Sequence, residues 1–351
     1  MHSKYLAVIT ILTAPFISAQ HLNEQPVSAI HDPREKHLAN VRQLTFGGVN
    51  AEAYFSFDEK KIIFQSTRPP FKCDQIFTMN IDGSNVKLVS TGKGRTTCSY
   101  YLLGDSEIIY SSTHLTDTAC PPPPDFRQGY VWKFYDEYEI FKAKPDGSNL
   151  RQLTHNLGYD AEATVSPVEA KIIFTSFRNG DLGIYTMDFD GGHITRLIDS
   201  LGYEGGPYYS WDGKKVVYRA FYPKDSAEIR EYRNLLAKRL LKPVVIEIYV
   251  ADSDGKNIRQ VTNHGAASFA PFFYPDNEHI IYASNVSDPQ RRSFQLRMIR
   301  EDGGEDEQVT YAGTFNSFPM FTHDGKKIIF CSNRNAKAPH EMNVFIADWV
   351  P

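Results

Sequence analysis

Carboxylates and imidazoles are the most reactive groups of the chain. Glu52 and Glu162 stand second in two closely related stretches, AEAYFSF and AEATVSP, and a pair of carboxyl groups can act as acid and base in the cleavage of a sugar. Four histidines lie in or beside predicted loops, where imidazoles can hold zinc or a similar metal, namely His114, His155, His264 and His340. They come from separate parts of the chain at irregular positions. We therefore interpret them as solvated loop residues and expect neither a metal nor a cofactor.

A second group of polar residues recurs beside short repeated strands. Several of these strands are followed by Arg or His two residues after a Ser, and two related loops read GYDAE and GYEGG. Together these positions mix carboxylates, phenols and cations, as a polar funnel would. The predicted ligand-binding residues are Glu52, Arg68, His114, Tyr159, Asp160, Glu162, Arg178, Tyr203, Glu204 and Arg334. The alternative is that the Arg and acid pairs lock neighbouring structural units together.

Motifs of established chemistry are missing from the sequence. We find no Gly-x-Ser-x-Gly, phosphate loop, dinucleotide fingerprint or His-Glu-x-x-His. The net charge of −4 and the pI near 6.3 argue against a nucleic-acid binder, which usually carries a basic stripe. The positions of the polar residues therefore depend on the elements that carry them.

One short strand is written six times. It appears as KKIIFQS, SEIIYSS, AKIIFTS, KKVVYRA, EHIIYAS and KKIIFCS, and the aromatic residues of these copies lie 46, 64, 44, 64 and 48 residues apart. Four-stranded propeller blades recur at about 40–50 residues, so three intervals fit directly and two contain an insertion. Apolar residues occupy consecutive positions, which is typical of a strand buried on both faces.

Each copy is flanked by further predicted strands. One precedes it, as in AEAYFSF, and two follow, as in GIYTMD and ITRLID. Between the last two lies Asp-Gly in five units, and Asp-Gly favours a tight hairpin turn. The sequence therefore predicts an all-β fold, a six-bladed β-propeller with four-stranded blades.

The sixth unit ends at NVFIADWVP without a fourth strand. A matching strand, VRQLT at residues 41–45, precedes the first unit. We expect it to pair with the last blade, because this closes the ring and removes exposed sheet edges. Residues 37–351 are then a single propeller domain.

Both insertions fall between the second and third strands of their units. One contains ACPPPPDFRQGYVW and the other AEIREYRNLLAKRLL. The second predicts a short helix capped by Asp225 with Glu228 three residues on, and Ile229, Tyr232, Leu236 and Leu240 on one side. Extra material on one face of a repeat array usually marks the binding face, although a helix that only covers an apolar patch is the alternative.

The first residues indicate export. MHSKYLAVITILTAPFISAQ has an early Lys, an apolar run and a small-residue exit, which predicts a secretory signal peptide at residues 1–19 and a linker at 20–36. No other run reaches the roughly 20 residues of a membrane helix. We expect a monomer in the periplasm or outside the cell. Among Cys73, Cys98 and Cys120 we expect one disulfide, with Cys331 buried.

The repeats also resemble a known family. FFYPDNEHIIYASN, FTHDGKKIIFCSNR and IYTMDFDGG are similar to the WD-like repeats of TolB-type six-bladed propellers. That resemblance covers nearly all of the predicted domain and implies the propeller fold. It also extends to the propellers of prolyl-oligopeptidase-like enzymes and of oligogalacturonate lyases. The TolB protein carries an additional N-terminal α/β domain without a counterpart here, so the resemblance implies function only as a class.

Taken together, these features predict an exported, non-enzymatic scaffold. Its partner would be an envelope or exported protein, a peptide or a polysaccharide, bound on the face that carries the insertions. One alternative is a polysaccharide lyase or hydrolase that uses funnel carboxylates or histidines. The other is an accessory propeller for a separate exported peptidase.

Overall fold

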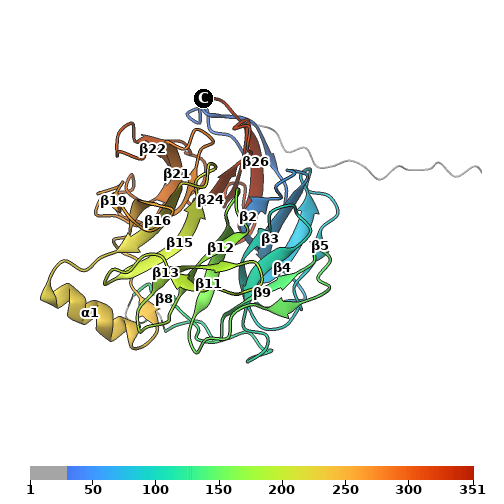
Figure 1. The fold of residues 1–351 in the computed structure, drawn as a ribbon. Helices are drawn as coiled ribbons and strands as arrows, with labels where there is room; N and C mark the ends of the chain where they lie inside the picture. The colour runs from blue at the N-terminus through green and yellow to red at the C-terminus, as the bar shows by residue number, and fades with distance from the viewer. Residues whose placement is uncertain (1–29, 126, 128) are drawn as a thin grey trace, which may run out of the picture.

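A computed structural model describes residues 30–125, 127 and 129–351 of the chain. The predicted signal peptide and the first part of the predicted linker lie outside the described residues. Six four-stranded antiparallel sheets succeed one another around a ring (Figure 1). The predicted six-bladed propeller is confirmed.

The first three blades follow the chain order. The first contains β2 (Val49–Phe55), β3 (Lys61–Thr67), β4 (Gln75–Asn80) and β5 (Lys87–Leu88). The second contains β6 (Thr96–Tyr101), β7 (Ile108–Ser112), β9 (Glu139–Ala143) and β10 (Arg151–Gln152). The third contains β11 (Asp160–Val165), β12 (Lys171–Ser176), β13 (Gly183–Asp188) and β14 (Thr195–Arg196).

The last three blades complete the ring. The fourth contains β15 (Tyr203–Tyr209), β16 (Lys215–Phe221), β18 (Glu247–Asp252) and β19 (Arg259–Gln260). The fifth contains β20 (Ser268–Phe273), β21 (His279–Ser284), β22 (Gln295–Arg300) and β23 (Glu307–Gln308). The sixth contains β24 (Asn316–Phe321), β25 (Lys327–Ser332), β26 (Asn343–Trp349) and, from the other end of the chain, β1 (Leu38–Gln43).

The repeated second strands form the centre of each blade. Ile62, Ile63 and Phe64 of β3 have no exposed surface, and the equivalent residues of the other five blades are also buried. Both faces of each sheet pack against neighbouring blades, which explains the consecutive apolar residues. Burial of this apolar surface is the main source of the fold's stability.

Strand β1 closes the ring as the sequence predicts, within slightly different bounds. It pairs antiparallel with β26, from Leu38 opposite Trp349 to Gln43 opposite Phe345. Leu44 then donates its amide to the carbonyl of Val344. The paired strand begins three residues before the predicted start at residue 41, because Leu38 is itself buried in the core.

The two insertions contact each other on one face of the ring. Strand β8 (Trp132–Lys133), from the second blade, pairs with β17 (Leu240–Leu241), from the fourth. Helix α1 (Ser226–Leu236) precedes β17 and lies outside the ring of blades (Figure 1). Its N-cap is Asp225, as predicted, and Tyr232 and Leu236 are buried. Leu240 is not on the helix, because the helix ends at Leu236 and Leu240 belongs to β17.

A disulfide joins Cys73 to Cys120 and attaches the first insertion to the neighbouring blade. Cys98 and Cys331 are free, and Cys331 is fully buried. The predicted single bridge among the first three cysteines is therefore confirmed. Within the described part of the chain, no helix is long and apolar enough to cross a membrane.

The closure of the ring makes a direct prediction. Leu38→Ala should lower the free energy of unfolding by about 2–4 kcal/mol, because the buried side chain leaves a cavity between β1 and the last blade. Urea unfolding followed by circular dichroism measures the loss. Arg42→Ala, at an exposed position of the same strand, should change it by less than about 0.5 kcal/mol. Equal losses for the two variants would contradict the role assigned to the buried face of β1.

Candidate functional site

Every blade places one residue at the ring axis through the same backbone feature. The first strand of each blade carries a β-bulge, where two residues of that strand are not paired with the second strand. The first of these two residues has a φ between 49° and 57° in all six blades. We call these six residues the axial ring, and they are Glu52, Cys98, Glu162, Gly206, Ala270 and Phe318.

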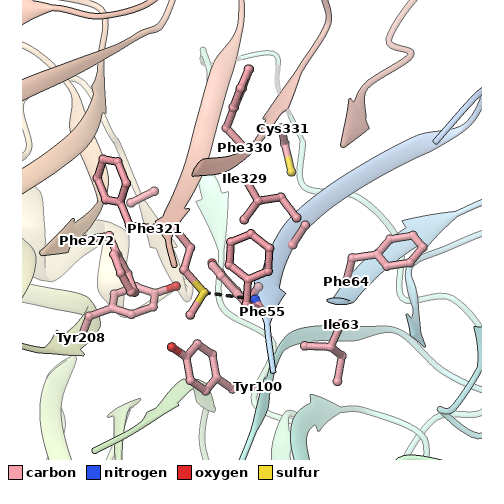
Figure 2. Packing of buried hydrophobic residues seen from close by; sticks show 14 of the residues in the cluster. Phe55, Ile63, Phe64, Tyr100, Tyr208, Phe272, Phe321, Ile329, Phe330 and Cys331 are labelled. Atoms are coloured by element: carbon pink, nitrogen blue, oxygen red, sulfur yellow. Dashed lines mark hydrogen bonds between the residues drawn. The ribbon is translucent and has the colours of Figure 1, made fainter. Parts of the chain in front are cut away.

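Below the axial ring, toward the face opposite the insertions, the axis is filled by large side chains. Tyr54 of the first blade lies 5.8 Å from Tyr208 of the fourth, ring centre to ring centre, although these blades are on opposite sides. Tyr100 and Phe272 pack against Tyr208 from two further blades (Figure 2). We call these four residues the aromatic layer. All four are at most 8% exposed, so the axis is closed at this level.

An ion pair crosses part of the axial ring. Arg219 of β16 donates a hydrogen bond to the Glu162 carboxylate. It donates a second one, 2.8 Å long, to the hydroxyl of Tyr203. Glu162 also accepts from Thr175 and from the amide of Gly206 at 2.7 Å each. A Cβ at Gly206 would lie 2.1 Å from the Arg219 guanidinium, so a larger residue there would displace the arginine. Burial alone would lower the pKa of Arg219, but Glu162 and Tyr203 hold it above its usual value.

Glu52 and Cys98 occupy the next part of the ring. The Glu52 carboxyl is enclosed by protein while its residue keeps some accessible surface. Burial raises the pKa of Glu52 to about 7, and the charge of Glu162 adds to this, while a hydrogen bond with Cys98 and the charge of Arg219 act in the opposite direction. The same surroundings raise the pKa of the Cys98 thiol. Glu52 therefore exchanges a proton near neutral pH, and no described cation is paired with it.

The other half of the axial ring is apolar. Phe269 packs against Phe294, Phe315 and Phe318 at ring distances of 5.1–6.3 Å. Above them lies Trp132 of β8, whose ring contacts both Phe269 and Tyr203 and receives the Arg219 guanidinium at 5.3 Å. The first insertion therefore places an aromatic side chain over the axial ring.

Tyr159 and Tyr203 support this insertion and are themselves covered by it. Phe134, two residues after Trp132, packs against both tyrosines at 5.1 and 5.9 Å. The two phenols are at most 6% exposed, and burial raises their pKa values. These predicted ligand-binding residues thus lie beneath the insertion and not at the surface.

The predicted pairing of Arg with an acid is found inside one blade, where it joins the first two strands. Arg178 donates to the Asp160 carboxylate of the same blade at 2.7 Å. The backbone amide of Asp160 donates to the carbonyl of Tyr138, which directly precedes β9 of the second blade. Burial raises the pKa of Asp160 to about 6, against the effect of Ser176 and Arg178. Arg68 makes the equivalent contact with Asn50 at 2.6 Å.

Arg334 is buried in the sixth blade. Its guanidinium makes a two-point ion pair with Glu35, at 3.0 and 2.9 Å, and donates to the Ile30 carbonyl and to Asn316. Glu35 also accepts the amides of Tyr311 and Ala312. Residues assigned to the predicted linker therefore pack on the propeller, and Arg334 does not face the solvent.

Glu204 fills a buried position that is equivalent to Asp160, without a cation directly bound to it. Tyr222 donates to Glu204 Oε1 at 3.0 Å, and Glu204 Oε2 has no partner among the described residues. Burial raises the pKa of Glu204 to about 8, with Tyr222 and Arg196 acting against it. The carboxyl group is consequently protonated at neutral pH.

The histidines do not come together. His114 is buried, bonds Ser112 at 2.8 Å and packs against Phe141, and burial lowers its pKa. His264, in the connection from the fourth to the fifth blade, lies 3.2 Å from Asp306 of the fifth blade. Among the residues described in the structure, no group of three or more His, Cys, Asp or Glu side chains is arranged to hold a metal ion.

Cys98, Arg219 and Trp132 were not among the site residues predicted from the sequence. Arg219 had a signal, because it directly follows the repeated aromatic residue. At that position the other blades carry uncharged residues, which are Gln65, Ser111, Thr175, Ala283 and Cys331. No sequence pattern pointed to Trp132, since the two insertions that pair around it are unrelated in sequence and repeat no motif of the blades.

Comparisons with known proteins agree with the fold. No family model matches the chain. The Tol-Pal system protein TolB of Francisella tularensis subsp. holarctica is 26% identical over 196 residues, which are 45% of this chain and 44% of that protein. The chain thus matches less than half the length of this curated relative.

Solved structures match over a larger part of the chain. A putative TolB from Agrobacterium tumefaciens superposes with a TM-score of 0.57 at 16% identity, covering 87% of this chain and 91% of that one. An oligogalacturonate lyase in complex with manganese reaches 0.52 at 13% identity, covering 89% and 93%. The chain is therefore a TolB-like six-bladed propeller in fold, and similar folds belong to proteins of different function.

The buried Glu204 gives a pH-dependent prediction. Its pKa is higher in the folded than in the unfolded protein, so its contribution to stability is complete below about pH 4.5 and is lost as the pH rises to about 8. Glu204→Gln should remove this loss. Relative to the variant, wild type should lose stability with a slope of up to about 1.4 kcal/mol per pH unit in that window, as measured by urea unfolding at pH 5, 6, 7 and 8.

The exposed Glu137→Gln is the matched control for this experiment. It should leave the pH dependence of wild type unchanged. If Glu204→Gln follows wild type at every pH, Glu204 is not protonated in the folded protein.

Proposed function

We propose that this protein is an exported scaffold that binds a protein, a peptide or an envelope polymer on the face that carries both insertions. The observation that supports this most is the joining of the two insertions. They come from different blades, yet β8 and β17 pair and, with α1, form one structural unit on one face. A propeller does not need such a unit to close its ring, and additions to one face of a repeat array commonly serve binding.

Exposed apolar side chains on the same face support the proposal. Leu157 is 99% exposed, and Phe46 and Leu115 are both 63% exposed. They lie on connections that share the face with the insertions, from the fourth strand to the next blade or from the second strand to the third. Each of these side chains would gain free energy if a partner buried it.

Export is supported by the disulfide and by the similarity to TolB. A disulfide between Cys73 and Cys120 is expected to persist in an oxidising compartment such as the periplasm. The Tol-Pal system, to which the similar TolB proteins are assigned, suggests a cell-envelope partner. We propose that the protein acts as a monomer.

A second candidate function is that of a polysaccharide lyase or hydrolase. The observation in its favour is Glu52, a carboxyl group with a pKa near 7 that lies beside Glu162 and Arg219 on the axis. A carboxyl group titrating near the working pH is suited to proton transfer. Cleavage of a uronate polymer by the purified protein, abolished in Glu52→Gln, would establish this function instead.

Charge substitutions on the two faces test the binding proposal. Leu157→Glu and Phe46→Glu should each reduce the amount of cross-linked partner recovered from an envelope extract by about tenfold, because a charge in the core of an interface must be desolvated. Quantitative mass spectrometry of the captured material measures the change.

Val168→Glu is the matched control, since Val168 is an exposed aliphatic residue on the opposite face. It should leave capture unchanged. An equal loss with Val168→Glu, or no loss with either of the other variants, would show that the partner does not bind on the inserted face.

A further inference from the structure

The paired insertions have a hydrophobic cluster of their own. It contains Phe134 and Leu241 from the insertions, Tyr232 and Leu236 from α1, and the tyrosines Tyr159 and Tyr203 from the blades. The main core, which joins the blades, is a separate cluster. Locally packed units of this kind can open without unfolding of the rest of a protein.

Outside this cluster, few direct contacts join the insertions to each other or to the blades. The pairing of β8 with β17 involves two residue pairs, and an exposed ion pair joins Arg239 to Asp136 at 2.5 Å. Helix α1 is held by a hydrogen bond from Tyr232 to Asp181 of the third blade. The Arg239 guanidinium also lies over Phe177 of the third blade at 4.0 Å, and the Cys73–Cys120 disulfide anchors the first insertion. A two-stranded ribbon of this size is at most marginally stable by itself, so its position depends on these contacts.

The ribbon of β8 and β17 lies over the axial ring. Trp132 contacts the fourth and fifth blades and Arg219, while Tyr159 and Tyr203 beneath Phe134 are close enough to Cys98 for its charge to affect their pKa values. On the other side of the axial ring, the aromatic layer is buried and closes the axis. The ribbon therefore lies on the side from which the axial ring is not closed by the aromatic layer.

We propose that the ribbon of β8 and β17 is a lid that opens locally and controls access to the axial ring. In the closed state Trp132 covers Arg219, which is itself paired with Glu162. Opening moves β8 and β17 away from the blades and leaves the six sheets intact. A ligand that reaches Glu52 or Arg219 must enter from the inserted face while the lid is open.

Two native thiols can report this motion. Cys98 belongs to the axial ring and keeps some accessible surface, whereas Cys331 is fully buried in the sixth blade. The other two cysteines are joined in the disulfide and do not react with alkylating reagents. Modification of Cys98 thus follows the lid, and modification of Cys331 follows unfolding of the blades.

The test is the rate of N-ethylmaleimide modification of the folded protein, read for each cysteine by peptide mass spectrometry at one fixed pH. Wild type should modify Cys98 much more slowly than urea-unfolded protein does. Trp132→Ala should raise the rate at Cys98 by about tenfold and leave the rate at Cys331 unchanged. Trp132→Phe, which keeps an aromatic ring over the axis, should stay within about twofold of wild type.

A second variant loosens the lid without changing Trp132. Asp136→Ala removes the ion pair with Arg239 and should raise the rate at Cys98 severalfold. Asp254→Ala breaks a comparable exposed ion pair, with Lys256 in a hairpin of the opposite face, and should have no effect. The proposal fails if neither lid variant changes the rate at Cys98, or if Cys98 and Cys331 accelerate together.

This inference takes its biological meaning from the proposed function, since it describes access to the same face. The thiol experiment nevertheless requires no partner. Unchanged thiol rates in the lid variants, combined with loss of capture in Leu157→Glu, would reject the lid and keep the binding face. Faster rates without any loss of capture would reject the binding face and keep the lid.

Discussion

The structure depends on the pairing of β1 with β26, because this contact joins the first strand of the propeller to its last and turns six sheets into a closed ring. Without it, β26 would expose an unpaired edge and the first and sixth blades would lose the packing that fixes their angle. Closure also brings opposite blades near enough for Tyr54 and Tyr208 to touch across the axis. The ion pair of Glu35 with Arg334 strengthens the same junction, since it attaches the segment before β1 to the sixth blade.

Much of this architecture could be predicted because it follows from short-range patterns. The consecutive apolar residues of the second strands, the Asp-Gly turns and the strand before the first unit each have a local physical cause. The axial ring has a different origin. A one-residue shift in a strand exchanges its two faces, and the β-bulges cause such a shift in the middle of every first strand. Glu52 and Glu162 were chosen from the sequence for their chemistry, and only the bulge explains why they point to the axis.

The predicted site residues separate into two groups for a similar reason. Asp160 and Arg178 lie at the ends of paired strands, so a repeated acid and cation at these positions satisfy each other. At the equivalent place in the fourth blade the residues are Glu204 and Tyr222, and the missing cation leaves a protonated carboxyl group. Arg219 lies three positions before Tyr222, on the opposite face of its strand, and pairs with Glu162 on the axis. The position of a charged residue along its strand thus decides whether it joins strands within a blade or faces the axis. The residue type alone does not reveal this position.

The asymmetry of the axial ring follows from the same geometry. Six equivalent bulges would place six equivalent side chains around the axis if the blades had identical sequences. Here the first three blades contribute Glu52, Cys98 and Glu162, whereas the fifth and sixth contribute Ala270 and Phe318 beside other phenylalanines. The insertions add their aromatic residue, Trp132, over the boundary between these halves, where it contacts both Arg219 and Phe269. Packing on both sides of this boundary requires an aromatic ring that accepts a cation on its face and apolar contacts at its edge. An aliphatic side chain at this position would satisfy only the apolar half.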